Sequence, residues 1–332
     1  MANHDIPRVS LGMPVYNGQP FIAQGIESIL SQTFEDFELI ISDNASTDNT
    51  KQICREYAAK DARVRYYRSD LNRGAAWNHN RVFELARAGY FKWNSADDLC
   101  APEFLARCVA ALDQDSTAVM ACTDIVVIDE HGKAVGTGII PVEVASANPH
   151  QRFRRNIRID HPCQHIYSLI RTKVLRTTDL IGNYDDSDRV LLAHLSLFGR
   201  CILIPEPLLF NRDHPGRFSR SYVGWRTREG TAWFDPSATK RRLFPFWREV
   251  KGSWGVIARS PLGLRDRLRC YNAVHWWFRY HKYTLLDELT YYPKRWMSRR
   301  SSDVKRVWNA LWARRPVGTS DENVRRSRAP KI

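Results

Sequence analysis

The strongest constraint on the fold is an alternation of strand-like and helix-like segments along the first two hundred residues. Apolar runs typical of buried strands occupy residues 8–13, 37–42, 64–67, 90–93, 118–128 and 201–204, and stretches typical of helices occupy residues 21–31, 46–59, 75–88, 102–113 and 188–198. Strands that alternate with helices at this spacing form βαβ units around a parallel sheet covered on both faces. We therefore expect an α/β fold with a mostly parallel sheet.

Polar residues cluster where three of these predicted strands end. The clusters span residues 14–18, 42–46 and 94–98. One such cluster alone is typical of a turn. Ligands of open α/β sheets collect at the carboxyl ends of the strands, however, so three clusters in the first hundred residues predict one shared pocket.

The third cluster contains two adjacent acids, Asp97 and Asp98. Neighbouring carboxylates repel each other unless a cation or hydrogen-bond donors compensate their charge. A hard divalent cation such as Mg²⁺ or Mn²⁺ does this, and it typically bridges carboxylate and phosphate oxygens. The alternative is that Asp98 caps the helix that begins near Pro102 while Asp97 faces water.

Four segments occur in a characteristic order: MPVYNG, SDNASTDNT, Asn72-Arg73-Gly74 with Asn80 following, and SADD. Together they resemble family 2 glycosyltransferases over roughly residues 6–222. The resemblance implies a GT-A catalytic domain, with a Rossmann-like, mostly parallel sheet, that transfers a sugar from a nucleotide-sugar donor with inversion. It also implies a divalent metal cofactor (Mn²⁺ or Mg²⁺) and, by family frequency, a UDP-sugar. The acceptor would be a glycan or a lipid-linked molecule of cell-envelope synthesis.

The resemblance also assigns roles to individual residues. The positions expected to contact the nucleotide-sugar are Pro14, Tyr16, Asn17, Asp43, Arg73 and Asp97. Among these, Asp43 matches the acid that hydrogen-bonds the base, and Asp97 matches the acid near the ribose and donor sugar. Asp98 matches the acid that coordinates the metal.

Two later segments fit the same family. Residues 187–199 are similar to the motif in which an Asp acts as general base at the start of a helix, and Asp188 has the matching spacing to Gly199. Ser187 replaces the usual Glu, and Asp185 and Asp186 lie just upstream, so all three acids remain candidates for the base, with Asp188 preferred. Residues 211–219 resemble the segment in which His214 joins the metal shell or touches the diphosphate. A neutral imidazole ligand favours Mn²⁺ over Mg²⁺.

These roles describe a single displacement in which Asp188 takes the proton of an acceptor hydroxyl while the oxygen attacks the anomeric carbon. Two other functions are considered. A nucleotidyltransferase would carry a Gly-rich, basic triphosphate signature near its N-terminus, which MPVYNG does not supply. A catalytically inactive relative acting as a binding protein would be expected to have lost acids that this chain retains at positions 43, 97, 98 and 188.

The last third of the chain differs in charge from the rest. Residues 240–332 hold 23 Lys and Arg against 7 Asp and Glu, whereas the whole chain carries +14. Residues 223–315 are predicted to be a helical, basic, Trp- and Arg-rich region, and residues 316–332 a disordered tail. Two interpretations remain open for this region: helices that dock on the catalytic domain, or peripheral binding to the inner face of the membrane. Nucleic-acid binding is not expected because no recognised module accompanies the charge.

The seven cysteines are scattered and show no CxxC spacing, which argues against a zinc site and a disulfide framework. The N-terminal residues lack the apolar run of a signal peptide, and no stretch approaches the roughly 20 apolar residues that span a bilayer. We therefore expect a cytoplasmic protein, either free or at the inner membrane face. The sequence does not indicate an oligomeric state.

Overall fold

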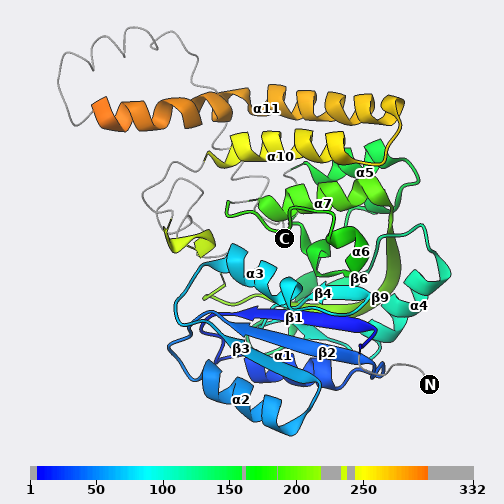
Figure 1. Cartoon of the computed structure of the whole chain (residues 1–332), viewed down its shortest axis with the longest axis vertical. Coiled ribbons are helices and arrows are strands. Elements are labelled where there is room, and N and C mark those ends of the chain that lie inside the picture. Colours follow the sequence, from blue (N-terminus) through cyan, green and yellow to red (C-terminus); the bar gives the residue numbers. More distant parts are fainter. Residues whose placement is uncertain (1–5, 159–161, 185, 218–232, 238–243, 298–332) are drawn as a thin grey trace.

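The computed structural model describes residues 6–158, 162–184, 186–217, 233–237 and 244–297. Nine strands form one sheet in the order β3-β2-β1-β4-β8-β6-β9-β5, with β7 paired to β6 (Figure 1). The strands are β1 (Val9–Val15), β2 (Phe37–Asp43), β3 (Val64–Arg68), β4 (Tyr90–Trp93), β5 (Leu99–Cys100), β6 (Met120–Ile128), β7 (Ala134–Thr137), β8 (Leu169–Arg171) and β9 (Cys201–Arg212).

The first four strands along the chain are parallel. β1 pairs with β2 and β4, and β2 pairs with β3. Val15 lies opposite Asp43 and Gly12 lies opposite Trp93, so the loops after β1, β2 and β4 leave the sheet at one edge. β8 is antiparallel to both β4 and β6, and β6 is parallel to β9. The predicted α/β fold with a mainly parallel central sheet is confirmed.

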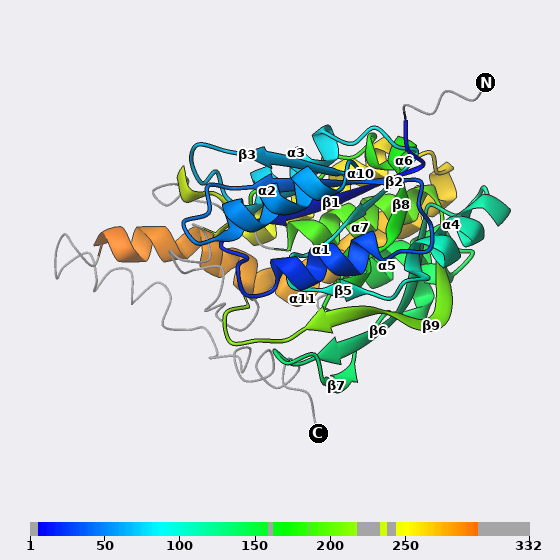
Figure 2. The same cartoon turned by 90° about the horizontal axis from the view of Figure 1, so that it is seen from below.

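Helices cover both faces of this sheet (Figures 1 and 2). The helices are α1 (Ile22–Leu30), α2 (Thr50–Lys60), α3 (Ala75–Glu84), α4 (Phe104–Gln114), α5 (Pro149–Asn156), α6 (Thr172–Leu175), α7 (Ser187–Phe198), α10 (Pro245–Arg259) and α11 (Leu264–Met297), with 3-10 turns η1 (Val142–Ala145) and η2 (Gln164–Tyr167). The side chains of β1 alternate, so Leu11 and Met13 join α1, α2 and α4 in one core. On the other face, Phe91 and Trp93 of β4 pack with α3, α6 and α7.

Two helices differ from the sequence-based expectation. α3 ends at Glu84 rather than near residue 88, because the backbone N–H groups of Arg87 and Ala88 donate to Ser10 Oγ. α5 was not among the helical stretches expected from the sequence. Its buried Arg152 donates to three backbone carbonyls, those of Ser146, Ala147 and Ser196, and such tertiary bonds leave no periodic apolar signal.

The C-terminal helices share a third core with the sheet domain. Val256 and Ile257 of α10 and Val274 of α11 pack with Phe153 of α5 and Val190 of α7. Of the two interpretations left open for this region, docking on the sheet domain therefore describes the inner faces of these helices. The proposed boundary at residue 222 and the tail after residue 315 lie outside the described residues. None of the described helices is long and apolar enough to cross a membrane.

Candidate active site

Hydrogen bonds tie the loop after β1 to the loop after β2. The backbone N–H of Asn17 donates to Ser46 Oγ (2.9 Å), and the N–H of Thr47 donates to Asn17 Oδ1 (2.8 Å). Asn17 adopts a left-handed φ of 55°, which Asn tolerates better than most residues. Half-buried Pro14 precedes this turn, and the neighbouring Tyr16 is 49% exposed. The two loops thus form one fixed edge that offers an exposed aromatic ring.

Asp43 ends β2 beneath this edge and is fully buried. Its carboxylate accepts hydrogen bonds from the N–H of Ser46 (2.8 Å), from the Tyr66 hydroxyl (2.7 Å) and from the guanidinium of Arg68. Arg68 also donates to the carbonyl oxygen of Ser46 (2.9 Å). The Asp43 carboxylate is therefore a fixed acceptor that holds the loop after β2.

Arg73 reaches the same edge through the loop before α3. Its backbone N–H donates to Asn44 Oδ1 (3.0 Å), and Asn44 Nδ2 donates to Asn72 Oδ1 (2.9 Å). The Arg73 guanidinium carbon lies 5.0 Å from the centre of the Trp77 ring. The structure therefore brings Tyr16, Asp43 and Arg73, which the sequence assigned to the donor, to one edge of the sheet.

Gly74 allows a C-terminal segment to cover this loop. Its φ is +89°, and a Cβ at this position would lie 2.2 Å from the carbonyl oxygen of Phe234. Phe234 is buried and packs with the core on the α3 side of the sheet. No other residue type fits here without moving the backbone of one of the two segments.

Asp98 follows β4 and lies inside the protein. Its carboxylate accepts hydrogen bonds from Asn211 Nδ2 (2.9 and 3.1 Å) and from the backbone N–H of Arg212 (2.8 Å). Burial, and secondly the neighbouring Asp97 carboxylate, raise the pKa of Asp98 to about 6. Asp98 thereby joins the loop after β4 to the end of β9.

Asp97 points to a different neighbour. Its Oδ2 lies 2.9 Å from Nε2 of His214, and Ser95 donates its hydroxyl to Oδ1. The ring of His214 is held 4.8 Å from the ring of Phe21. Asp97 and His214 are therefore in direct contact, whereas Asp98 supports the end of β9, which leads to His214.

Asp188 lies in the first turn of α7 and is half-buried. Oδ1 accepts a hydrogen bond from the N–H of Arg189 (2.8 Å). Burial, and secondly the charge of Asp186, raise the pKa of Asp188 to about 6. Asp186 instead faces Arg189, with its Oδ1 3.4 Å from Nη2. Asp185, the third candidate base, lies outside the described residues.

Two further residues connect these acids, and the sequence analysis did not select them. Tyr167 is the last residue of η2. Burial raises the pKa of its hydroxyl, and the negative charges of Asp98, Asp97 and Asp188 raise this pKa further. Arg217 donates to Asn211 Oδ1 (2.8 Å), and its charge lowers the pKa of Asp98. Arg217 stands within residues 211–219, the segment that resembles the family around His214, whereas Tyr167 follows a stretch without any motif.

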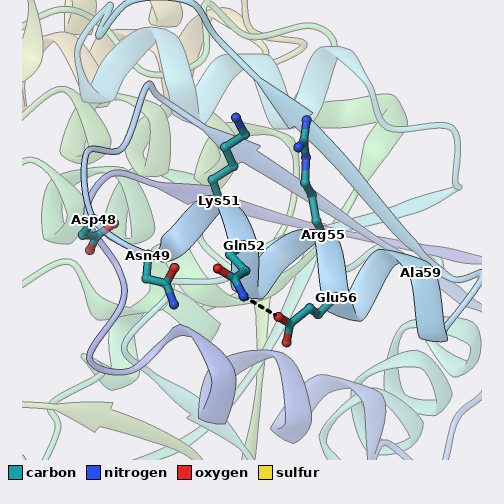
Figure 3. Close-up of a pocket in the computed structure, with 7 residues that line it drawn as sticks. All are labelled: Asp48, Asn49, Lys51, Gln52, Arg55, Glu56 and Ala59. Carbon is teal, nitrogen blue, oxygen red and sulfur yellow. Dashed lines mark hydrogen bonds between the residues drawn. The ribbon is translucent and has the colours of Figure 1, made fainter.

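A surface hollow of the described structure lies elsewhere, along α2. Its lining residues are Asp48, Asn49, Lys51, Gln52, Arg55, Glu56 and Ala59 (Figure 3). It is open to solvent on one side of a single helix and contains none of the acids discussed above. The site is therefore assigned from the strand ends and their side chains.

A divalent cation at this site would have few protein ligands. Within the described ranges, no group of three or more His, Cys, Asp or Glu residues could hold a metal ion. The adjacent Asp97 Oδ2 and His214 Nε2 provide one carboxylate and one imidazole. Mg²⁺ and similar ions at nucleotide sites are usually held by one or two carboxylates together with phosphate oxygens and water. This pair fits a cation shared with a diphosphate.

Comparisons with known proteins agree with this architecture. The chain is 36% identical over 136 residues to the putative glycosyltransferase EpsE of Bacillus subtilis. The aligned region covers 41% of this chain and 49% of EpsE. The chain is also 32% identical over 133 residues to the chondroitin synthase of Escherichia coli, covering 40% of this chain and 19% of that protein. The chain thus spans about half or less of the length of these curated relatives.

Among solved structures, S. aureus TarS 1–349 in complex with UDP-GlcNAc matches with a TM-score of 0.59 at 16% identity, over 78% of this chain and 69% of that one. This similarity shows the GT-A fold. The family model "Glycosyl transferase family 2" matches residues 10–177, which is half of the chain, and Asp188 and His214 lie beyond that match. On this match, the chain belongs to glycosyl transferase family 2.

Proposed function

We propose that the protein is an inverting glycosyltransferase that moves a sugar from a UDP-sugar to an acceptor hydroxyl. The observation that carries this proposal is the placement of two acidic groups around one side chain. The negative charges of Asp97 and Asp98 and that of the separate Asp188 all raise the pKa of Tyr167, which supports placing both acidic groups near this side chain. One group is suited to the departing diphosphate and the other to the attacking hydroxyl.

The donor nucleotide is proposed to bind along the edge formed by the loops after β1, β2 and β3. The exposed ring of Tyr16 offers a stacking surface for the base, and Arg73 offers a cation. The loops are already cross-linked through Asn17 and Asn44, so binding requires little ordering of the backbone. UDP is preferred by family frequency, and TarS, which shares the fold, was crystallised with UDP-GlcNAc.

Asp97 and His214 are proposed to hold the divalent cation, Mn²⁺ or Mg²⁺. When bound, the cation would neutralise charge on the diphosphate. The sequence had assigned the ligand role to Asp98. We propose instead that Asp98 is a positioning residue, because both of its oxygens already accept hydrogen bonds from β9. These bonds fix the strand that leads to His214.

Asp188 is proposed to act as the general base. The acceptor oxygen would form a bond to the anomeric carbon while the bond to the diphosphate oxygen breaks, and the acceptor proton would move to the Asp188 carboxylate. A pKa of about 6 makes this carboxylate a stronger base than an ordinary Asp while leaving it ionised at neutral pH. Attack on the face opposite the leaving group inverts the configuration.

The acceptor is proposed to be a glycan or a lipid-linked glycan of the cell envelope. The relatives include a chondroitin synthase, whose name describes polysaccharide synthesis.

A donor screen tests the proposal. The protein is incubated with UDP-, GDP- and dTDP-sugars with and without Mn²⁺, and thermal unfolding is followed. A bound donor stabilises the folded state by mass action, so the correct donor should raise the melting temperature only when the metal is present. Release of UDP on addition of an acceptor then measures transfer. Donor binding without any transfer or hydrolysis would instead indicate a catalytically inactive binding protein.

A further inference from the structure

α11 has two faces with different environments. Its inner face carries Cys270, Val274, Trp277 and Leu285, all buried in the core shared with α5, α7 and α10. These positions recur every three or four residues, or two turns apart, as expected for one face of a helix. Helix docking therefore explains this face and leaves the opposite one without a partner among the described residues.

The outer face of α11 is unusually apolar for an exposed surface. Of the sixteen exposed large hydrophobic residues of the described structure, eight lie on this single helix, and five of the eight lie on its outer face. They include Trp276 (62% exposed), Tyr280 (79%) and Tyr283 (52%), together with Leu268 and Leu286. A concentration of this kind marks an interaction surface, whereas apolar residues scattered singly do not.

The same face is basic. Arg265, Arg269, Arg279 and Lys282 are exposed on α11. The Arg279 guanidinium carbon lies 5.5 Å from the centre of the Trp276 ring, and Lys282 Nζ lies 4.9 Å from that of Tyr283. Cations and aromatic rings therefore alternate along the outer surface of the helix.

Positions 265, 268, 272, 276, 279, 283 and 286 follow one another at steps of three or four residues and define a single stripe along α11. We call the exposed residues along this side of the helix the α11 outer face: Arg265, Leu268, Arg269, Asn272, Trp276, Arg279, Tyr280, Lys282, Tyr283 and Leu286. Figure 1 shows α11 as the outermost helix, and Figures 1 and 2 both show its C-terminal end extending beyond the body of the protein.

We propose that the α11 outer face binds an anionic lipid bilayer, with the helix lying in the plane of the headgroups. Rings of Trp and Tyr are suited to the headgroup level, and the exposed cations are suited to anionic lipid. The helix does not have the apolar length needed to cross a membrane, so this contact is peripheral. The proposal does not depend on the catalytic roles assigned above.

Charge complementarity favours an anionic bilayer over two other possible partners of this surface, a second copy of the chain and residues 298–332 of the same chain. A second copy paired symmetrically would bring the basic stripe of one chain against that of the other, and like charges repel. Residues 298–332 of the same chain hold 10 Lys and Arg against 3 Asp and Glu, so they carry the same sign of charge. An anionic bilayer carries the opposite sign.

Vesicle flotation of the full chain tests the contribution of the exposed cations to bilayer binding. We expect binding to vesicles of phosphatidylcholine with phosphatidylglycerol at low salt, weaker binding at high salt, and little binding to phosphatidylcholine alone. Each removed charge should weaken vesicle affinity about fivefold, so the double variant Arg265→Gln/Arg279→Gln should lose about 25-fold. The matched control is Lys51→Gln/Arg55→Gln on α2, which removes two exposed charges and should bind as the parent does.

The aromatic part is tested with Trp276→Ser/Tyr283→Ser, against the control Val135→Ser/Val142→Ser, which removes two other exposed apolar side chains. The first variant should lose vesicle binding and the second should retain it. Light scattering of the same variants reports the oligomeric state. The proposal would be overturned if the parent protein did not bind vesicles, or if a test variant and its control lost binding equally. It would also be overturned if the parent were an oligomer without vesicle binding and this oligomer dissociated in Trp276→Ser/Tyr283→Ser. The last result would show that the face binds a second copy.

Discussion

Asp43 and Asp188 are both acids at the carboxyl edge of the sheet, yet their surroundings differ. Asp43 is fully buried and accepts hydrogen bonds from Ser46, Tyr66 and Arg68. Asp188 is half-buried and accepts a bond from the amide of the next residue, and its pKa is raised to about 6. A carboxylate surrounded by donors holds structure, whereas one short of donors is ready to accept a proton. The environment, rather than the residue type, separates the two tasks.

Replacing the proposed base, Asp188, should give the largest effect. Asp188→Asn preserves shape but cannot accept the acceptor proton, so turnover should fall about 100- to 10,000-fold. Nucleotide affinity, measured by calorimetry, should remain within about twofold of the parent, because the carboxylate does not touch the donor edge. Asp186→Asn is the matched control and should retain most activity. Unchanged turnover in Asp188→Asn would remove this residue from the mechanism.

Removing the proposed metal ligands should have the next largest effect. Asp97→Ala and His214→Ala each delete one of the two ligands that lie 2.9 Å apart. Donor affinity in the presence of Mn²⁺ should decrease about 10- to 100-fold, while affinity measured with a chelator should be the same as for the parent. If the two variants and the parent bound the UDP-sugar equally with Mn²⁺, the pair would have no part in the metal site.

Stability should change in opposite directions at the two acids. Asp43→Asn leaves donors of Arg68 and Tyr66 facing an amide and should lower the free energy of unfolding by about 1–3 kcal/mol. Asp188→Asn removes an ionised carboxyl whose burial is unfavourable at pH 7, so this variant should raise the free energy of unfolding by about 1–3 kcal/mol. Chemical denaturation at pH 7 measures both. If both variants changed the free energy of unfolding equally and in the same direction, Asp43 and Asp188 would not differ in their effect on stability.

The pH dependence gives the smallest and most selective effect. Only the ionised Asp188 can accept a proton, so the rate should rise with pH and reach half of its maximum near pH 6. Asp186→Asn removes a charge that raises this pKa, and should move the midpoint to lower pH. The folded-state pKa exceeds the usual 3.8, so the unfavourable contribution of Asp188 to stability is present above about pH 6 and is lost as pH falls towards 4. A pH–rate profile that is the same in both proteins would contradict the assignment.

Much of the fold was predictable because apolar periodicity reports burial directly. Strands β1, β2 and β4 bury nearly every residue, and their polar end loops marked the donor edge. The direction of a carboxylate was not predictable. Asp98 turns inward because the side chain of Asn211 and the backbone of Arg212, more than a hundred residues away, supply donors. Tyr167 was missed for a similar reason, since its neighbours come from three distant segments.

The covering of Gly74 by Phe234, together with the core shared by α5, α7, α10 and α11, bears on how this protein can be shortened. A chain cut at residue 177, where the family match ends, would lose α7 with Asp188. It would also lose Phe234, which covers the loop that contains Arg73 and Gly74. A cut before α10 would leave Phe153 and Val190 facing water. We therefore expect the smallest fragment that folds on its own to extend through α11, and chimaeras should exchange α5, α7, α10 and α11 as one block.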